Sequence, residues 1–425
     1  MHVLIIGAGG FIGRHIAGRL LADGLRVTLA GRRPDGLAHR WPQAEILACD
    51  LAHDDVHTWL PRLTGVDAVV NCAGLIGNRA DYAGVHDRGA RTLFDACHAA
   101  GVGRVIQMSA LGADEGGVTP YHRSKRRADD HLASLDPAGE RMGWAILRPS
   151  LVLGRGGASM ALFATLAALP LTPRLGKGNW QVQPIHIDDL VEAVVQLLNH
   201  SRPLALKLDA VGPAPMTTDE LTASLRCWLG LGAARCMAIP RWMLALVASL
   251  GIGPATHESL TMLAAGNCAP VAPFVSALGF RPMPIDQALA RHPAAPADLA
   301  EARDSAIAPI LPVLLALVWL AGGIVSLAFA PPDLITTWLT RVGLTGLAAT
   351  ATLWAGSLAD IAIGIALLAR VRGAALAGVA LMLAYTAILT AVAPELWADP
   401  FGPLVKNIAV LGLSLAVHAK EFRHG

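Results

Sequence analysis

The chain has 425 residues, of which 54% are hydrophobic and only 16% are charged, a balance too apolar for a wholly soluble protein. The formal net charge is +2 and no long basic run with interleaved aromatic residues occurs, so nucleic acid is excluded from the expected partners. Six cysteines lie scattered without a Cys-x-x-Cys pair, which favours free thiols over a disulfide framework or a zinc site.

The first predicted element is a glycine-rich turn between a strand and a helix. Four apolar residues at 3–6 run into the glycines, and the helical pattern begins at Phe11. Gly7 permits a sharp turn, Gly9 leaves room for a pyrophosphate, and Gly13 lets the helix pack closely on the sheet. The helix N-terminus would offer unpaired N–H groups to phosphate oxygens. We therefore predict a dinucleotide site formed by Gly7, Gly9, Gly10, Phe11, Ile12 and Gly13.

Over residues 1–150, apolar runs typical of strands alternate with amphipathic stretches typical of helices. Further strands are predicted at 26–30, 45–49, 67–71, 104–108 and 144–147, with helices near 53–63, 86–100 and 121–134. Such alternation implies right-handed crossovers and a parallel sheet covered by helices on both faces. The predicted fold class is α/β, with a Rossmann-type, doubly wound parallel sheet.

Between residues 151 and 290 the alternation loosens, and frequent prolines and glycines predict a small substrate lobe that completes the fold. Thr217–Glu220 has the spacing of a capping box before a helix that ends at Gly230. Asp189–Glu192 predicts a second helix start of the same kind. Residues 291–305 are rich in alanine, proline and charge, and are predicted to be a linker.

Four apolar segments follow, at about 307–329, 346–369, 373–393 and 402–418, each near the ~20 residues that a helix needs to cross a bilayer. We expect a four-helix transmembrane domain over residues 306–425, in contact with membrane lipid. An even number of spans places both ends of the chain on one side. Basic residues would gather on this side, which is therefore expected to be the cytoplasmic one: Arg303, Arg370, Arg372, Lys420 and Arg423. The N-terminal domain and the C-terminus are thus expected in the cytoplasm, and the spans in the cell inner membrane.

Asp360 lies about two-thirds along the second apolar segment, where a carboxyl group is costly and marks a candidate functional site. Lys406 or Asn407 is its expected partner. A hydrogen bond that only packs the helices is an equally open explanation. His53 and His57 are spaced four apart, but further ligands are not evident, so we predict a solvated helix start and no metal site.

The end of the second strand indicates the choice of cofactor. An NAD enzyme usually offers a carboxylate to the ribose 2′-hydroxyl at this place, but this chain has Arg32 and Arg33. Two guanidinium groups favour the 2′-phosphate, and hence NADP(H) over NAD(H), unless both simply face solvent. Residues after the third and fourth strands lie where a ligand would sit in such a sheet: Asp50, Leu51, Asn71, Ala73 and Gly74.

A second constellation carries the candidate catalytic groups. Tyr121 and Lys125 are four residues apart, on one face of a predicted helix, and Ser109 ends the fifth strand. An ammonium group near a phenol lowers the pKa of the phenol, which would make Tyr121 a proton donor or acceptor. Ser109 would hold the carbonyl or hydroxyl of a substrate, and Lys125 would also reach the ribose of the cofactor.

Residues 1–290 resemble the extended or atypical branch of the short-chain dehydrogenase/reductase superfamily, which comprises epimerase/dehydratase-like proteins that bind NAD(P). The matching segments are Gly7-Ala-Gly-Gly-Phe-Ile-Gly13, Asn71-Cys-Ala-Gly74, Ser109-Ala-Leu-Gly-Ala-Asp114, Tyr121-His-Arg-Ser-Lys125, Leu147-Arg-Pro-Ser150 and Gln183-Pro-Ile-His-Ile-Asp-Asp189. The resemblance implies that Ser109, Tyr121 and Lys125 are the catalytic triad. It also implies that Arg148 and Pro149 lie beside the nicotinamide.

One departure concerns the helix after the fourth strand, where the family often has an asparagine that supports a proton relay. The corresponding residue is His86, which either substitutes in the relay or marks its loss.

The apolar segments in turn resemble the DoxX-like family of four-helix membrane domains, some of whose members are linked to quinone and sulfur redox systems. The matching residues are Leu317-Val-Trp-Leu-Ala-Gly-Gly-Ile-Val-Ser326 and Asp399-Pro-Phe-Gly-Pro-Leu-Val-Lys-Asn407.

Together these features predict a membrane-anchored, NADP(H)-dependent oxidoreductase that acts on a lipophilic carbonyl or quinone-type substrate. The expected partners are this small lipophilic substrate, membrane lipid and a membrane redox complex. Two alternatives stay open. The departure at His86 favours a non-catalytic NADPH-binding sensor or assembly factor of a membrane complex. A nucleotide-sugar epimerase or dehydratase would also use Tyr121 but would prefer NAD, against which Arg32 and Arg33 argue.

Overall fold

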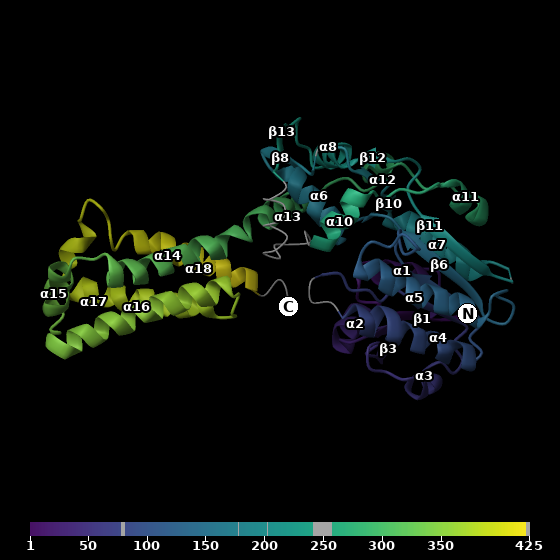
Figure 1. Cartoon of the computed structure of the whole chain (residues 1–425), viewed down its shortest axis with the longest axis horizontal. Helices are drawn as coiled ribbons and strands as arrows, with labels where there is room; N and C mark the ends of the chain where they lie inside the picture. Colours follow the sequence, from purple (N-terminus) through teal and green to yellow (C-terminus); the bar gives the residue numbers. More distant parts are fainter. Residues whose placement is uncertain (78–80, 177, 202, 241–256, 422–425) are drawn as a thin grey trace. The chain divides into compact units, whose positions relative to one another are not determined.

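The computed structural model describes residues 1–77, 81–176, 178–201, 203–240 and 257–421. The chain divides into two compact units, Met1–Arg303 and Asp304–Gly425. The first is a mixed α/β unit and the second is built from helices (Figure 1).

A seven-stranded sheet forms the centre of the first unit, and its strand order is β11-β6-β5-β4-β1-β2-β3. Every neighbouring pair in this sheet is parallel. The order reverses between β1 and β4, which is where a ligand binds in a doubly wound sheet. The predicted fold class is therefore confirmed. The strands are β1 (His2–Ile6), β2 (Arg26–Gly31), β3 (Glu45–Ala48), β4 (Ala68–Asn71), β5 (Arg104–Met108), β6 (Gly143–Pro149) and β11 (Ala205–Ala210).

Helices cover both faces of the sheet, because alternate strand residues point to opposite sides. In β1, Val3 and Ile5 join one buried cluster, and Leu4 and Ile6 join the other. The first cluster also contains residues of α1 (Phe11–Ala22), α2 (Pro34–Arg40), α7 (Ile187–Asn199) and α11 (Ala272–Leu278). The second contains residues of α3 (Val56–Arg62), α4 (Ala90–Ala99) and α5 (Pro120–Leu135). Burial on both faces explains the nearly continuous apolar runs of the strands.

A third buried cluster forms the smaller lobe of this unit, from helices and short strand pairs. The helices are α6 (Ala158–Ala168), α8 (Thr218–Trp228), α10 (His257–Ala265), α12 (Ile285–Arg291) and α13 (Pro296–Ile307). The strand pairs are β7 (Val152–Leu153) with β10 (Ile185–His186), β8 (Leu171–Arg174) with β13 (Arg235–Ala238), and β9 (Gln181–Val182) with β12 (Met216–Thr217).

Local signals in this lobe had mixed outcomes. The capping box of Thr217 and Glu220 is confirmed at the start of α8. The helix predicted to open at Asp189 is present as α7, but it begins two residues earlier, at Ile187, and His186 is its cap in place of Asp189. The Asp189 carboxylate instead accepts a hydrogen bond from the Met283 N–H, at 2.8 Å. The second half of the predicted linker is helical, since it forms α13.

The second unit contains α14 (Ile310–Ala328), α15 (Pro332–Arg341), α16 (Gly346–Leu368), α17 (Ala374–Val392), the 3₁₀ helix η2 (Pro394–Trp397) and α18 (Lys406–Glu421). Within the described residues, three stretches are long and apolar enough to span a membrane: Pro296–Ala328, Gly346–Leu368 and Ala374–Val392. The fourth predicted span corresponds to α18, which has 16 residues and carries charge at both ends. Four spans are therefore not confirmed.

Glycines allow α14 and α16 to pack closely. A Cβ atom added at Gly323 would lie 2.5 Å from the Ser357 carbonyl oxygen. The Tyr385 hydroxyl of α17 donates to the Asp360 carboxylate at 3.3 Å, whereas Asn407 donates to Thr386 at 2.8 Å. The predicted pairing of Asp360 with Lys406 or Asn407 is therefore wrong, because the rotation of α17 places a tyrosine beside it.

Two glycines of α1 offer a direct test of the close packing behind the glycine turn. A Cβ at Gly13 would lie 2.4 Å from the Gly7 carbonyl oxygen, whereas a Cβ at Gly18 would meet nothing within 4 Å. We expect Gly13→Ala to destabilise the N-terminal unit by about 1–3 kcal/mol through overpacking. Gly18→Ala should stabilise it by about 0.5–1 kcal/mol through helix propensity. Thermal unfolding of both variants of the full chain in detergent measures the difference, and equal melting temperatures would contradict this account.

Candidate active site

The glycine turn leaves its main chain open at the carboxyl end of β1. Gly7 has a φ of +74°, and an added Cβ would lie 2.9 Å from the Ala73 nitrogen, so only glycine fits. Gly9 is exposed, and an added Cβ would meet only the Leu37 side chain, at 3.6 Å. Gly10 caps α1 without any side-chain hydrogen bond. These features fit a pyrophosphate placed against the bare N-terminus of α1.

The arginines predicted to select the cofactor lie just beyond β2. Arg32 and Arg33 are both exposed, and neither has a hydrogen bond or ion pair within the described part of the chain. The pKa of Asp50 is lowered mainly by its hydrogen bond with His53. The positive charge of the nearby Arg32 lowers it further, by a smaller amount. The neighbouring Leu51 is buried. Two unengaged guanidinium groups are therefore available to an anionic group at this edge.

Asn71 organises the loop after β4. Its side-chain nitrogen donates to Gln107 at 2.8 Å, and its side-chain oxygen accepts from the Ala73 N–H at 3.1 Å. The Lys125 ammonium donates to the carbonyl oxygens of Ala73 and Met108, at 3.1 and 2.9 Å. A Cβ at Gly74 would lie 3.5 Å from this nitrogen. The loop and the ends of β4 and β5 thus converge on one buried cation.

Lys125 is only 3% exposed, and burial lowers its pKa to about 8, although Asp129 and Cys72 favour the charged form. A group with this pKa remains mostly protonated at neutral pH. The hydrogen bonds to two carbonyl oxygens offset part of the cost of burying the charge.

Tyr121 lies in the first turn of α5, where the Thr119 hydroxyl caps the helix by accepting from the His122 N–H at 3.2 Å. Its ring meets the rings of His86 and Tyr82 edge-on, with centroids 5.4 and 5.9 Å away. Its hydroxyl has no hydrogen-bond partner among the residues that the structure describes. Burial raises the pKa of Tyr121, so the predicted lowering by Lys125 is wrong for this state. The ammonium is engaged by main-chain carbonyls, and desolvation dominates.

Ser109 contacts a residue that the sequence analysis missed. Its hydroxyl donates to the Asp129 carboxylate at 2.5 Å, and Arg148 Nε lies 3.6 Å from the same oxygen. Asp129 is fully buried, and burial raises its pKa to about 6 against the opposing effects of Ser109, Arg148 and Lys125. Its position four residues after Lys125, on the same helix face, is the signal that could have revealed it.

His86 comes from the π-helix η1 (Ala83–Gly89), which replaces the first part of the helix predicted at 86–100. Its Nε2 accepts from the Leu75 N–H at 2.8 Å, so the proton is assigned to Nδ1, which lies 3.2 Å from the Ser124 hydroxyl. Burial lowers the pKa of His86 to about 2, so the ring stays neutral. His86 therefore holds the loop after β4 against α5, and no hydrogen bond joins it to the Tyr121 hydroxyl.

A second contact missed by the sequence analysis comes from the smaller lobe. The Tyr82 hydroxyl donates to the Glu258 carboxylate of α10, and the Tyr82 ring stacks on His86 with centroids 5.3 Å apart. Glu258 is far from Tyr82 in the chain, which is why no local pattern indicated it. A carboxylate of the smaller lobe therefore lies close to the candidate catalytic tyrosine.

Asp129 predicts a specific dependence of stability on pH. Its folded-state pKa of about 6 lies above the ordinary value of about 4, so the folded chain binds this proton more tightly. The resulting stabilisation is complete below about pH 4 and is lost as the pH rises through about 6, at a cost of about 3 kcal/mol. Asp129→Asn should abolish this loss in urea unfolding of the full chain in detergent.

The matched control is Asp130→Asn. Asp130 is exposed; desolvation is the largest single effect on its pKa and raises it, but the hydrogen bonds and charges of Lys207 and Arg126 together outweigh it, so the pKa is lowered. This variant should therefore keep the fall in stability that comes from Asp129. The same fall in Asp129→Asn as in the unsubstituted chain would show that Asp129 is not the titrating group.

Two reductases are among the known proteins with similar sequences. A ceramide reductase of Caulobacter vibrioides is 33% identical over 199 residues, which cover 45% of this chain and 59% of that protein. A 2-alkyl-3-oxoalkanoate reductase of Stenotrophomonas maltophilia is 27% identical over 44% of this chain and 62% of its own length. The chain thus spans less than two thirds of either relative.

Two solved structures share the fold of the N-terminal unit. A UDP-glucuronic acid 4-epimerase of Bacillus cereus superposes with a TM-score of 0.55 and 18% identity, over 72% of this chain and 99% of that one. The dTDP-glucose 4,6-dehydratase DesIV of Streptomyces venezuelae gives a TM-score of 0.54 and 22% identity, over 72% and 97%. At such identities the likeness concerns the fold alone.

Family profiles match both parts of the chain. Residues 3–206 match the NAD dependent epimerase/dehydratase family, and residues 316–415 match the DoxX-like family. The chain therefore joins an N-terminal epimerase/dehydratase-like domain to a C-terminal DoxX-like domain.

Proposed function

We propose that the chain is a membrane-held, NADP(H)-dependent reductase of a lipophilic carbonyl compound or quinone. The observation that carries this proposal is the arrangement of Ser109, Tyr121 and Lys125 at the carboxyl edge of the sheet. Ser109 and Lys125 are held by hydrogen bonds, whereas the Tyr121 hydroxyl is unengaged within the described residues. A phenol hydroxyl without a partner in the described residues, one helical turn before a fixed ammonium group, suits proton transfer to a substrate oxygen.

The raised pKa of Tyr121 supports the direction of the reaction. Desolvation raises the pKa of the half-buried Tyr121, so its phenol is protonated at neutral pH and can begin the reaction as a proton donor. Carbonyl reduction needs this role: the substrate carbon receives a hydride and its oxygen receives the proton of Tyr121. The bound nicotinamide would supply the hydride. Ser109 would orient the carbonyl oxygen, and Lys125 would hold the ribose and stabilise the phenolate left on Tyr121.

The proposal of a lipophilic substrate is supported by the apolar C-terminal helices and by the names of two relatives. Three described stretches are apolar enough to span a membrane, and all of them lie after the last strand of the seven-stranded sheet. Two relatives are named as reductases of ceramide, which is a lipid, and of a 2-alkyl-3-oxoalkanoate, which is a ketone with alkyl chains. We further propose that the spans lie in the cell inner membrane, with the N-terminal domain on the cytoplasmic side, and that a membrane redox complex is a partner.

One observation favours a second candidate, a non-catalytic NADPH sensor or assembly factor. His86 replaces the expected relay residue, is neutral and uses both ring nitrogens in contacts with Leu75 and Ser124. A site that binds the cofactor but lacks a path to resupply the proton would respond to NADPH without turnover. The two proposals differ in whether NADPH is consumed.

Tyr121→Phe tests the catalytic role. In full-length protein reconstituted with phospholipid, we expect NADPH oxidation by a panel of long-chain ketones and quinones, and a fall in kcat of at least about 100-fold in the variant. Binding of NADPH should stay within about threefold, because the ring is retained. Equal rates in both proteins would overturn the role of Tyr121. NADPH binding without turnover on any acceptor would instead support the sensor.

The Arg32→Ala/Arg33→Ala variant tests the preference for NADP(H). Loss of charge-assisted contacts to a 2′-phosphate should raise the Kd of NADPH about 10- to 100-fold. The Kd of NADH should change less than about threefold, since NADH lacks this phosphate. Arg91→Ala, which removes an exposed guanidinium paired with Asp87, is the control for net charge. An equal loss for both cofactors would show that the arginines do not select the phosphate.

A further inference from the structure

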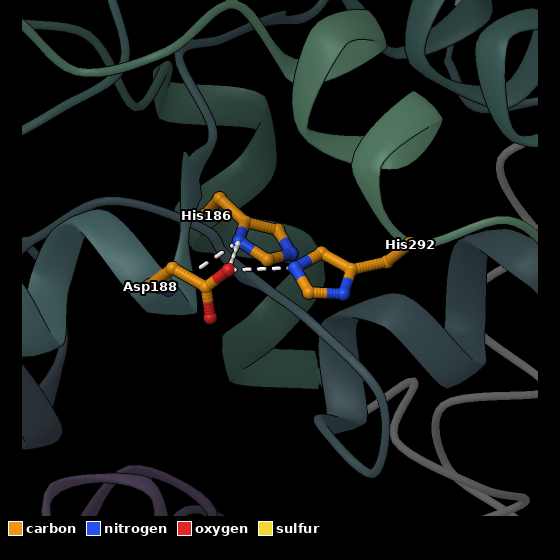
Figure 2. A group of neighbouring side chains, drawn as sticks. All are labelled: His186, Asp188 and His292. Carbon is orange, nitrogen blue, oxygen red and sulfur yellow. Dashed lines mark hydrogen bonds and ion pairs between the residues drawn. The ribbon is translucent and has the colours of Figure 1, made fainter. Parts of the chain in front are cut away.

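Three side chains from separate segments converge at the start of α7. His186 ends β10 and caps α7, Asp188 lies in the first turn, and His292 follows α12. Each offers one ligand atom, and these atoms lie within 4.8 Å of one another. Figure 2 shows both imidazoles directed at the same Asp188 oxygen, at 3.3 Å from His186 Nδ1 and 2.7 Å from His292 Nε2. The rings stack with centroids 5.2 Å apart.

Nδ1 of His186 faces both the main-chain N–H and the carboxylate of Asp188. The Asp188 N–H donates to Nδ1 of His186, at 3.3 Å, as the helix cap. A nitrogen that accepts this bond carries no proton, so it and the Asp188 oxygen are two acceptors that face each other. A cation between them removes the repulsion.

The scaffold holds these three residues in place. His186 pairs with Leu153 in the β10–β7 ladder, and its side chain is 7% exposed. The His292 N–H donates to Leu289, and its carbonyl oxygen accepts from the Trp228 indole at 2.8 Å. Little rearrangement is therefore needed to bring the ligand atoms to one ion. Sequence analysis predicted no metal here because Asp188 and His292 are 104 positions apart.

A fourth imidazole lies near the three ligands. The side chain of His15 in α1 lies close enough to Asp188 and His186 to interact electrostatically with both. Its Nδ1 is buried and has no hydrogen-bond partner within the described part of the chain. His15 lies one turn beyond Phe11, in the helix of the glycine turn. A buried ring nitrogen without a partner, close to three potential ligands, is suited to serve as an additional or alternative metal ligand.

We propose that His186, Asp188 and His292 form a binding site for one divalent zinc-type cation. Two imidazole nitrogens and one carboxylate oxygen are the ligand types that Zn²⁺ takes, whereas Ca²⁺ and Mg²⁺ prefer oxygen alone. Water or His15 would complete four-coordination. The ion would tie α7 to the segment after α12, so it would stabilise the N-terminal unit. This site is independent of the proposed reductase activity, since none of its ligands belongs to the Ser109, Tyr121 and Lys125 set.

The test is a zinc titration of the full chain in detergent after removal of metal with a chelator. We expect one equivalent of Zn²⁺ bound, a higher melting temperature with zinc, and Zn–N distances of about 2.0–2.1 Å by X-ray absorption. His292→Ala and Asp188→Asn should each weaken zinc binding by at least about 100-fold. Binding of NADPH by the variants, without zinc, shows that they are folded.

His131→Ala is the matched control, because His131 Nε2 lies 2.7 Å from the Asp95 carboxylate in another His–Asp pair. This variant should bind zinc as the unsubstituted chain does. Three results would overturn the proposal: no bound zinc in the unsubstituted chain, unchanged affinity in His292→Ala and Asp188→Asn, or an equal loss in His131→Ala. If His292→Ala fails to bind NADPH, Asp188→Asn, which removes charge and little volume, decides the question.

Discussion

The candidate site depends on one buried positive charge. Lys125 is nearly inaccessible to solvent, and its ammonium bonds the main chain at the ends of β4 and β5. An unpaired charge in this position would cost several kcal/mol. Asp129 supplies the opposite charge one turn later in α5, and it accepts from Ser109 and faces Arg148. Four adjacent elements, β4, β5, β6 and α5, are thus fixed to one another through a small polar network, whose members act together and not singly.

Sequence patterns predicted the parts of this design that are local. The glycine turn, six strands of the sheet and the spacing of Tyr121 and Lys125 each lie within a short segment, so periodicity and turn chemistry reveal them. The seventh strand, β11, was missed because it lies in a loosely patterned region. The electrostatics of Tyr121 were wrong because desolvation, which no spacing reports, outweighs the nearby ammonium. Glu258 and His292 were missed because only folding brings them to their partners.

In the C-terminal unit, too, sequence patterns predicted the helices but not the contacts between them. Apolar composition predicted the helices, and close glycine contacts between α14 and α16 are consistent with packing by small residues in a membrane. The partner of Asp360 depends on the rotation of each helix about its axis. Hydropathy does not encode this rotation, so the tyrosine was overlooked in favour of polar residues nearer the end of the chain. The length of α18 likewise depends on the residue at which the helix begins. Hydropathy does not mark this residue, because the loop before it, which contains proline and glycine, is part of the same apolar segment.

The bare N-terminus of α1 has a consequence for the state without nucleotide. Gly10 provides no side-chain acceptor, so the first N–H groups of the helix lack the partner that a serine or aspartate cap would supply. A pyrophosphate bound in the turn would complete the helix as well as being held by it. A bound nucleotide would then serve as the missing cap, and the order of the first turn of α1 would report cofactor occupancy in amide hydrogen exchange.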